Sequence, residues 1–170
     1  MAMADINIRD DKTLTDFTVV SREGGRYPCH RLFLATQSPV MMAMITHDMK
    51  EKQKSEVTLD YSDEVVKYFV DFFYTGSVPQ KVLLENFDSF LALSEFYDVK
   101  PLKLQTEEAA IEKITVGNMI DMFALADRYN AENLKEVSEC LIKTNRNVLK
   151  DQDLSGVPAN VFAEVFRLLC

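Results

Sequence analysis

Two short runs with β-strand character open the hydrophobic pattern, within the segment FTVVSREGGRYPCH at residues 17–30. FTVV is rich in residues that favour strands, and Tyr27 and Cys29 alternate with other residues in the returning run. Gly24-Gly25 between the two runs suits a tight turn. The pattern therefore predicts a β-hairpin, and Pro28, which has no amide hydrogen, predicts an open side on its second strand.

The next apolar segment, RLFLATQSPVMMAMI at residues 31–45, has a helical pattern interrupted by Pro39. Proline lacks the amide hydrogen of a helix interior and clashes with the preceding turn, so one continuous helix is excluded. Ser38-Pro39 instead suits an N-cap followed by proline at the first helical position. We expect two short helices, 31–36 and 39–46, and then a strand at EVTL, residues 56–59.

YSDEVVKYFVDFFYTG, residues 61–76, has the features of a buried helix. Ser62 suits the N-cap, Asp63 and Glu64 favour the positive N-terminal end, and Gly76 suits the exit. Apolar side chains cover most of its circumference, which predicts a central helix. The resulting order, strand-strand-helix-helix-strand-helix, predicts an α+β fold with a small sheet flanked by helices.

From residue 82 the pattern is only helical, and it repeats. FLALSEFYDVKPLKLQTEEAAI and MFALADRYNAENLKEVSECLI align at a spacing of 32 residues. The matched pairs are Ala92/Ala124, Leu93/Leu125, Tyr97/Tyr129, Leu102/Leu134, Lys103/Lys135 and Glu107/Glu139. Such a period predicts stacked helical hairpins, and two copies are too few for an independent solenoid, so we expect them to pack on the α/β part. A last helical pair is predicted at 145–150 and 158–169.

The chain of 170 residues has a net charge of −8, with 47% hydrophobic and 27% charged residues. This is an ordinary globular composition, and the acidic balance argues against nucleic-acid binding, which depends on clustered Lys and Arg. The cluster Lys50, Lys52 and Lys54 alternates with other polar residues and suits a solvated loop. No apolar run has membrane-spanning length and the start MAMADINIRDD does not resemble a signal peptide, so we expect no membrane association.

The three cysteines, Cys29, Cys140 and Cys170, form no CxxC pair and are odd in number. Neither a disulfide framework nor a zinc site is indicated, which favours a reducing compartment, the nucleus or the cytoplasm.

Little in the sequence points to catalysis. Cys29 and His30 are adjacent at a strand end and point to opposite faces, so they do not suit a nucleophile-base pair. His47 is the only other histidine, and no glycine-rich phosphate loop is present. We therefore predict no catalytic residues, no metal site and no cofactor, with His30 fixing the strand-to-helix junction by hydrogen bonding.

The segment DFTVV…YPCHRLFLATQSPVMMAMI resembles the opening of a BTB/POZ domain. Its matching positions are Asp16, His30, Leu34, Ser38 and Pro39, with Met41 where phenylalanine is usual, and Tyr74-Thr75-Gly76 match a later segment. The resemblance covers nearly the whole chain. Within the family, the sequence looks most similar to the speckle-type POZ group of MATH-BTB cullin-3 adaptors. It implies a BTB/POZ domain in residues 1–110, with a short N-terminal arm, and a 3-box/BACK-like helical extension in residues 111–170.

The resemblance also implies a function, that of a substrate adaptor in a cullin-3 RING ubiquitin ligase. Cullin-binding members carry a hydrophobic-x-Glu motif, and Met49-Lys50-Glu51 stands at that place, with residues 116–142 as a 3-box candidate. Met49 is the apolar exception in the polar run THDMKEKQK, and a flexible methionine adapts to an apolar groove. Tyr97 and Asp98 are expected to continue the surface for the cullin-3 N-terminal domain, although a tyrosine at this repeat position also suits the core.

Members of this family commonly dimerise through an N-terminal helix and strand. Here Ile6 and Ile8 alternate like a strand, and the usual helix is short or absent. We predict a homodimer interface at Ile6, Ile8, Phe17 and Leu32, with a monomer as the alternative.

Relatives recruit protein substrates through a separate domain such as MATH, and we expect that domain to lie outside this chain unless substrates bind the BTB and helical surfaces directly. A second function class stays open, a self-associating scaffold of the transcriptional co-regulator type. A third possibility is a protein made only of helical repeats that binds peptides. It accounts for residues 82–145 but not for the SPVMMAMI and FFYTG segments. Phe162, Val165, Phe166 and Leu169 suit either a core stripe or self-association.

Overall fold

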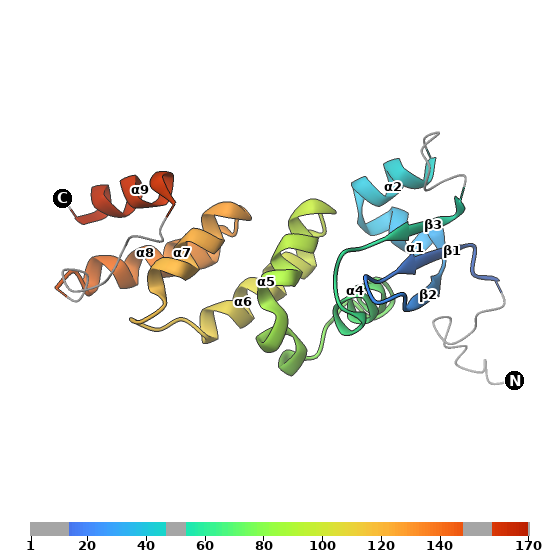
Figure 1. Cartoon of the computed structure of the whole chain (residues 1–170), viewed down its shortest axis with the longest axis horizontal. Coiled ribbons are helices and arrows are strands. Elements are labelled where there is room, and N and C mark those ends of the chain that lie inside the picture. The colour runs from blue at the N-terminus through green and yellow to red at the C-terminus, as the bar shows by residue number, and fades with distance from the viewer. Residues whose placement is uncertain (1–13, 47–53, 148–157, 170) are drawn as a thin grey trace, which may run out of the picture. The chain divides into compact units, whose positions relative to one another are not determined.

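The computed structural model describes residues 14–46, 54–147 and 158–169 (Figure 1). Contacts divide the chain into two compact units, one with residues up to Pro79 together with Leu93–Leu102, the other with Gln80–Ala92 and the residues from Lys103 onward. The described elements are β1 (Phe17–Val20), β2 (Arg26–Cys29), α1 (Arg31–Gln37), α2 (Pro39–Thr46), β3 (Glu56–Thr58), α4 (Asp63–Thr75), α5 (Gln80–Phe96), α6 (Lys100–Glu112), α7 (Met119–Arg128), α8 (Glu132–Thr144) and α9 (Ala159–Leu169). The predicted α+β class is confirmed, and the described part is mostly helical.

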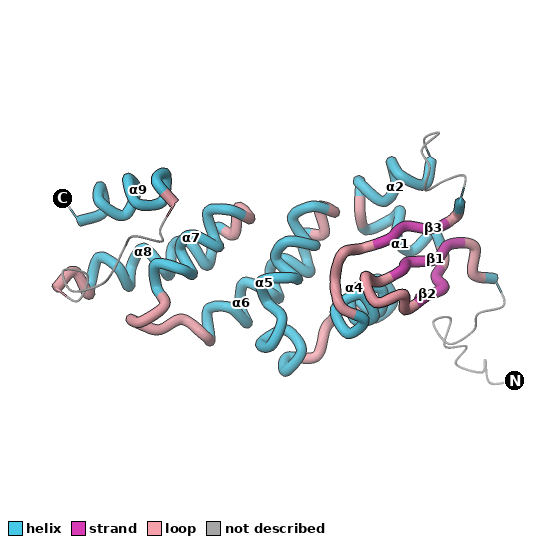
Figure 2. The backbone as a smooth tube through the Cα atoms, viewed as in Figure 1, coloured by secondary structure: helices cyan, strands magenta, loops and turns pink. Residues whose placement is uncertain are grey.

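The first unit contains a three-stranded sheet with the order β2-β1-β3, drawn in magenta in Figure 2. β1 and β2 form the predicted hairpin, with Phe17 opposite Cys29 in antiparallel register. Pro28 lies in β2, which is an edge strand of this sheet, so its missing amide hydrogen costs no ladder bond. β3 pairs with β1 in parallel register, an arrangement that local sequence patterns do not specify.

Ser38 separates the two short helices as the sequence predicts. Its backbone amide donates to the carbonyl oxygen of Leu34 at 3.0 Å and closes α1. Its hydroxyl oxygen accepts the amide hydrogen of Met41 at 3.0 Å and caps α2, which begins at Pro39. Leu34 and Met41 are both fully buried, so the two helices place their apolar faces in one core.

The predicted central helix is α4. Its N-cap Ser62 accepts from the amide of Val65, and Gly76, with a φ of 70°, ends the helix in the left-handed region that favours glycine. Its buried side chains include Phe69 and Phe72, and the helix packs against β1, β2 and α1. The cap residues and the all-round apolar pattern were therefore sufficient to predict this element.

The 32-residue repeat is confirmed by two turns with the same hydrogen bonds. Asp98 and Asn130 have φ values of 50° and 48°. Directly after them, the amide of Val99 donates to Ser94 and the amide of Ala131 donates to Ala126, each at 2.8 Å. In each copy of the repeat, the first helix thus ends at a residue with left-handed backbone conformation. This residue reverses the chain, so that the second helix of the hairpin can begin.

The second unit has two apolar clusters. One contains Leu91, Ala110, Ala126, Ala131 and Leu134. The other joins Met119, Ile120, Phe123 and Ile142 of α7 and α8 to Val161 and Val165 of α9. α9 therefore covers one face of the α7–α8 hairpin, and it confirms the last predicted helix.

One predicted boundary is wrong in part. Residues 145–147 were expected to begin a helix, but they form a turn in which the amide of Asn145 still bonds to Leu141 at the end of α8. Residues 148–150 of that prediction lie outside the described residues.

Candidate protein-interaction surfaces

A buried hydrogen bond joins the start of α2 to the turn between α5 and α6. The hydroxyl of Ser38 donates to the carbonyl oxygen of Tyr97 at 2.5 Å, while its oxygen also caps α2. Both residues belong to the first compact unit. The bond fixes the backbone of the α5–α6 turn beside the α1–α2 corner, so residues of both segments line one surface.

Tyr97 and Asp98, the predicted pair at this turn, have different environments. Tyr97 is 5% exposed, and its ring centroid lies 5.5 Å from that of Phe69 and 4.9 Å from that of Phe96. Asp98 is exposed. Tyr97 therefore contributes to the core and Asp98 to the surface, and their contact with a partner stays a prediction.

The α1–α2 corner and the α5–α6 turn enclose an open hollow of about 430 Å³. It is lined by Ala35, Thr36, Gln37, Pro39, Met42, Asp98, Lys100 and Pro101. Met42 exposes a flexible apolar side chain here, and the oppositely charged Asp98 and Lys100 line the same hollow. An apolar centre with a charged border is typical of protein-protein contact surfaces. We call these eight residues the corner surface.

Sequence reasoning did not single out Met42. A signal existed, because PVMMAMI is apolar at nearly every position, whereas a short surface helix has only one face to bury. Some of its apolar side chains had to remain exposed.

Met49 and Glu51, the predicted docking motif, lie outside the described residues. α2, which carries Met42, ends at Thr46, and the segment that contains the motif follows it along the chain. The assignment of Met49 and Glu51 to cullin binding stays a prediction.

Of the predicted dimer residues, Ile6 and Ile8 also lie outside the described part of the chain. Phe17 is buried in the sheet, with the guanidinium carbon of Arg31 5.7 Å from its ring centroid. Leu32 on α1 is exposed, as is Leu14, just before β1. Among the described candidates, Leu32 offers apolar surface to a partner, and the interface itself stays a prediction.

Cys29 and His30 do not interact as a catalytic pair. Cys29 is fully buried, and burial raises the pKa of its thiol to about 12, which disfavours the reactive thiolate. The backbone amide of His30 donates to the hydroxyl of Tyr74 at 2.8 Å, and its Nδ1 lies at the same distance from that hydroxyl. The prediction that His30 fixes the strand-to-helix junction by hydrogen bonding is confirmed.

Within residues 14–46, 54–147 and 158–169, no group of three or more His, Cys, Asp or Glu side chains is arranged to hold a metal ion. None of the helices in these ranges combines the length and apolar character needed to cross a bilayer.

A family model of the BTB/POZ domain matches residues 6–114, well over half of the chain. The matched range covers the sheet, α1, α2, α4, α5 and α6. BTB/POZ domains are protein-interaction modules, generally without catalysis, that commonly self-associate and serve in cullin-3 adaptors. With the three-stranded sheet, its flanking helices and this match together, the chain belongs to the BTB/POZ domain family.

Proposed function

We propose that this chain is the adaptor module of a cullin-3 RING ubiquitin ligase, which docks on the N-terminal domain of cullin-3. The observation that carries the proposal is the corner surface, where the exposed Met42 lines one hollow together with Asp98 and Lys100. Met42 of this surface lies on α2, the helix that directly precedes the segment with Met49 and Glu51 along the chain.

The chemistry of these residues suits a docking interface. Met49 is the apolar anchor, and a flexible thioether adapts to the groove of a partner. Met42 extends the apolar centre, while Asp98 and Lys100 form a charged border that favours one orientation of the partner. Glu51 accepts hydrogen bonds from the partner or from its own segment.

The helical extension in residues 111–170, and within it the 3-box candidate 116–142, adds a second contact for cullin-3. In this proposal the chain acts without catalysis or a cofactor, in the nucleus or cytoplasm. Protein substrates bind through a separate domain, such as MATH, as in the MATH-BTB adaptors that the sequence resembles.

Homodimerisation completes the proposal, and it also supports the alternative function. Leu32 and Leu14 are large apolar side chains that remain exposed in the single chain. Pairing of two copies removes such surface from water and is favourable. A self-associating scaffold of the co-regulator type would use the same dimer and would not bind cullin-3.

Two measurements on the full chain separate these functions. Calorimetric titration with the isolated cullin-3 N-terminal domain is expected to show saturable binding with one cullin domain per BTB chain. Light scattering at several concentrations is expected to give the mass of a dimer. A dimer that gives no binding heat would support the scaffold instead, and a monomer mass at high concentration would refute the dimer.

A further inference from the structure

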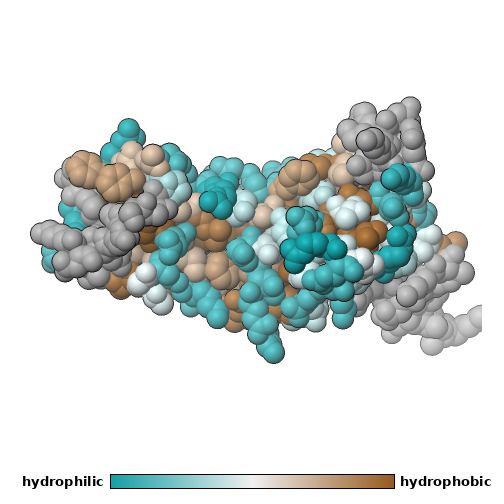
Figure 3. All heavy atoms as spheres, in the orientation of Figure 1, coloured by the Kyte–Doolittle hydropathy of each residue, from teal (hydrophilic) through white to brown (hydrophobic). Residues whose placement is uncertain are grey.

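Ser55 has a backbone conformation that is uncommon for a residue with a side chain. It lies directly before β3, and its φ of 55° falls in the left-handed region that favours glycine. Its carbonyl oxygen accepts the amide of Thr18 at 2.9 Å, where the pairing of β3 with β1 begins. Ser55 is half-buried, Lys54 before it is exposed, and Figure 3 shows several hydrophilic side chains over the strands. Ser55 therefore marks the point where a polar segment joins the sheet.

The hydroxyl of Ser55 faces the guanidinium of Arg31, the first residue of α1. Nη2 of Arg31 donates to the hydroxyl oxygen at 2.5 Å. Nε of the same guanidinium donates to the carbonyl oxygen of Asp16 at 3.2 Å, and the guanidinium carbon lies 5.7 Å from the centroid of the Phe17 ring. These contacts fix the direction of the Arg31 side chain, so a group attached to the Ser55 oxygen would meet a preorganised cation.

Arg31 has no close carboxylate partner among the described residues. The Asp16 carboxylate is 3.9 Å from Nε and 56% exposed, and one of its oxygens already accepts the backbone amide of Arg31. A guanidinium carries five N–H donors and binds phosphate through parallel hydrogen bonds. At Ser55 it contacts a neutral hydroxyl through Nη2 instead. The arrangement leaves capacity for an anion with several acceptor oxygens.

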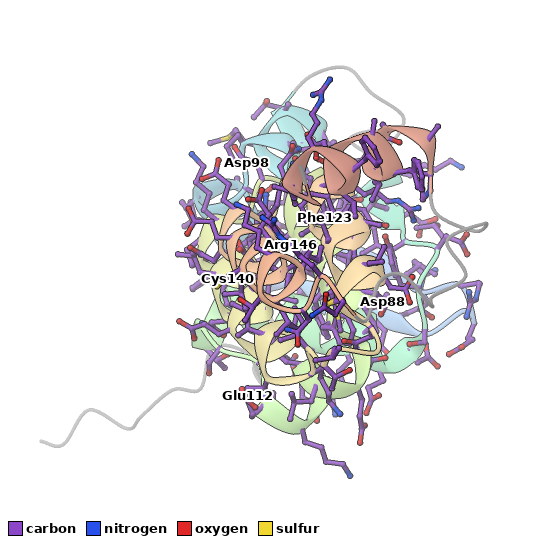
Figure 4. The ribbon with its side chains drawn as sticks, turned by 90° about the vertical axis from the view of Figure 1, so that its left-hand side faces the viewer. Asp88, Asp98, Glu112, Phe123, Cys140 and Arg146 are labelled. Atoms are coloured by element: carbon purple, nitrogen blue, oxygen red, sulfur yellow. The ribbon has the colours of Figure 1, made fainter. Side chains whose placement is uncertain are left out.

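Two other arginines show which oxygens a guanidinium contacts elsewhere in this fold. Nη2 of Arg26 is 2.8 Å from a carboxylate oxygen of Glu56, so the acidic residue after Ser55 already has a counter-charge. Arg146, labelled in Figure 4, donates to the carbonyl oxygen of Leu168 at 3.2 Å. Arg31 differs from both, because the oxygen that its Nη2 contacts belongs to a hydroxyl, which can be converted into a charged group.

The sequence before Ser55 has a charge pattern that suits recognition by a protein kinase with a preference for basic substrates. Lysines stand at positions −5, −3 and −1, a combination that no other serine or threonine of this sequence has: Lys50, Lys52 and Lys54. Acidic side chains of such a kinase contact the basic residues before the acceptor. Thr106 and Ser138 also follow a lysine by three positions, but both are fully buried in helices. The lysine run therefore singles out Ser55.

We propose that Ser55 is a phosphorylation site and that Arg31 holds its phosphoryl group. A serine/threonine kinase transfers the γ-phosphoryl group of ATP to the Ser55 oxygen. The bond from phosphorus to this oxygen forms, the bond to the β-phosphate oxygen breaks and ADP leaves, while the hydroxyl proton passes to a base of the kinase. The product carries a charge of about −1.5 to −2 at neutral pH and has three acceptor oxygens.

The phosphoryl group ties α1 to the start of β3. Its oxygens accept parallel hydrogen bonds from Arg31, in place of the single bond that the hydroxyl accepts. Ser55 stands four positions after Glu51, so the modification also changes the charge of the segment with the proposed docking motif. The phosphorylation site itself does not depend on the proposed docking function.

Phosphorylation of the full chain tests the site. The chain is incubated with Mg-ATP and the catalytic subunit of cyclic-AMP-dependent protein kinase, and the phosphopeptides are mapped by mass spectrometry. Phosphate is expected at Ser55, and Ser55→Ala should lose this labelling. Ser77→Ala is the matched control, because Ser77 is exposed and no lysine run precedes it. Lys52→Ala, which removes the charge at position −3, should slow the labelling by about fivefold or more.

A phosphorus-31 NMR titration of the phosphorylated chain tests the role of Arg31. Phosphoserine in water has a second pKa of about 6, and a neighbouring guanidinium favours the dianion, so a lower pKa is expected. Arg31→Gln should return the pKa to about 6, and Arg31→Lys, which keeps the charge, should retain part of the lowering. Arg22→Gln is the control, because the Arg22 guanidinium contacts Glu23 and not Ser55.

Circular dichroism and thermal melting verify that each variant is folded. Absence of phosphate at Ser55, or equal labelling of Ser55→Ala and Ser77→Ala, would overturn the phosphorylation site. A phosphoserine pKa that is the same in Arg31→Gln as in the unsubstituted sequence would overturn the assignment of Arg31 as the residue that holds the phosphoryl group.

Discussion

The hydroxyl of Ser38 donates a 2.5 Å hydrogen bond to the carbonyl oxygen of Tyr97, across 59 positions of the chain. The same hydroxyl oxygen accepts from the amide of Met41 and so caps α2. One fully buried side chain therefore satisfies two backbone groups that belong to different segments. This bond fixes Asp98, the next residue after Tyr97, at the edge of the corner surface.

Ser38→Ala is expected to lower the free energy of unfolding by about 1–3 kcal/mol, because it leaves a buried carbonyl and a helix amide without a partner. Urea unfolding of the full chain measures the change. Thr36→Ala is the control, since the Thr36 hydroxyl bonds only within its own helix and the residue is exposed. Equal stabilities of the two variants would contradict the structural role of Ser38.

The Glu107 carboxylate accepts the backbone amides of Asn133 at 2.7 Å and Leu134 at 3.1 Å. Glu107→Ala is expected to destabilise the chain by about 2–3 kcal/mol, because these two amides at the start of α8 lose a charged acceptor. Glu107→Gln retains an acceptor oxygen and should recover part of the loss. Glu108→Ala changes the exposed neighbour and should have little effect. A Glu107→Ala variant as stable as Glu108→Ala would show that Glu107 is not the cap of α8.

Asn130 has a φ of 48°, a conformation that costs a residue with a Cβ atom more than it costs glycine. Asn130→Gly is therefore expected to leave the stability unchanged or raise it by up to about 1 kcal/mol. Asn130→Ala is expected to lower it by about 1 kcal/mol, since alanine lacks the tolerance of asparagine for this region. Thermal melting of the pair tests the turn, and an alanine variant more stable than the glycine variant would contradict it.

The thiols of Cys29 and Cys140 should react very differently. Cys140 is exposed, whereas Cys29 is buried and the pKa of its thiol is raised from 9.0 to about 12. In a Cys170→Ser background, a thiol reagent at pH 8 is expected to modify Cys140 rapidly and Cys29 only through unfolding. Equal rates for the two thiols would contradict the burial of Cys29.

The raised pKa of Cys29 also gives the sign of a pH effect. Above about pH 9 the unfolded chain loses the thiol proton, while the folded chain keeps it to about pH 12. The unfolded state then binds fewer protons, so this group lowers the free energy of unfolding as pH rises through that window. Cys29→Val should reduce the alkaline loss of stability measured by urea unfolding.

Much of the fold could be predicted because its signals are local. Ser38-Pro39 marks the break between α1 and α2, and Gly76 marks the end of α4, each through the backbone conformation of one or two residues. The 32-residue spacing likewise identified equivalent turns before their hydrogen bonds were known. Such features depend on neighbours along the chain, which a sequence pattern contains.

The remaining features depend on residues far apart in sequence. Nothing near Glu107 indicates that it caps α8, and nothing near Ser38 indicates its bond to Tyr97. Asn86 adopts non-helical angles inside α5, with a φ of −133°, in a segment whose pattern predicts a regular helix. Tyr97 and Asp98 are adjacent in a motif, yet the reversal of the chain buries one and exposes the other.

The central claim is docking on cullin-3, and calorimetric titration of two variants with the cullin-3 N-terminal domain tests it most directly. Met49→Asp places a charge at the proposed apolar anchor, and Lys52→Asp introduces the same side chain elsewhere in the same polar segment. Met49→Asp is expected to weaken binding by about tenfold or more, as loss of an interface anchor does, while both variants keep the melting temperature of the unsubstituted chain. An affinity of Met49→Asp equal to that of the unsubstituted chain would contradict the account.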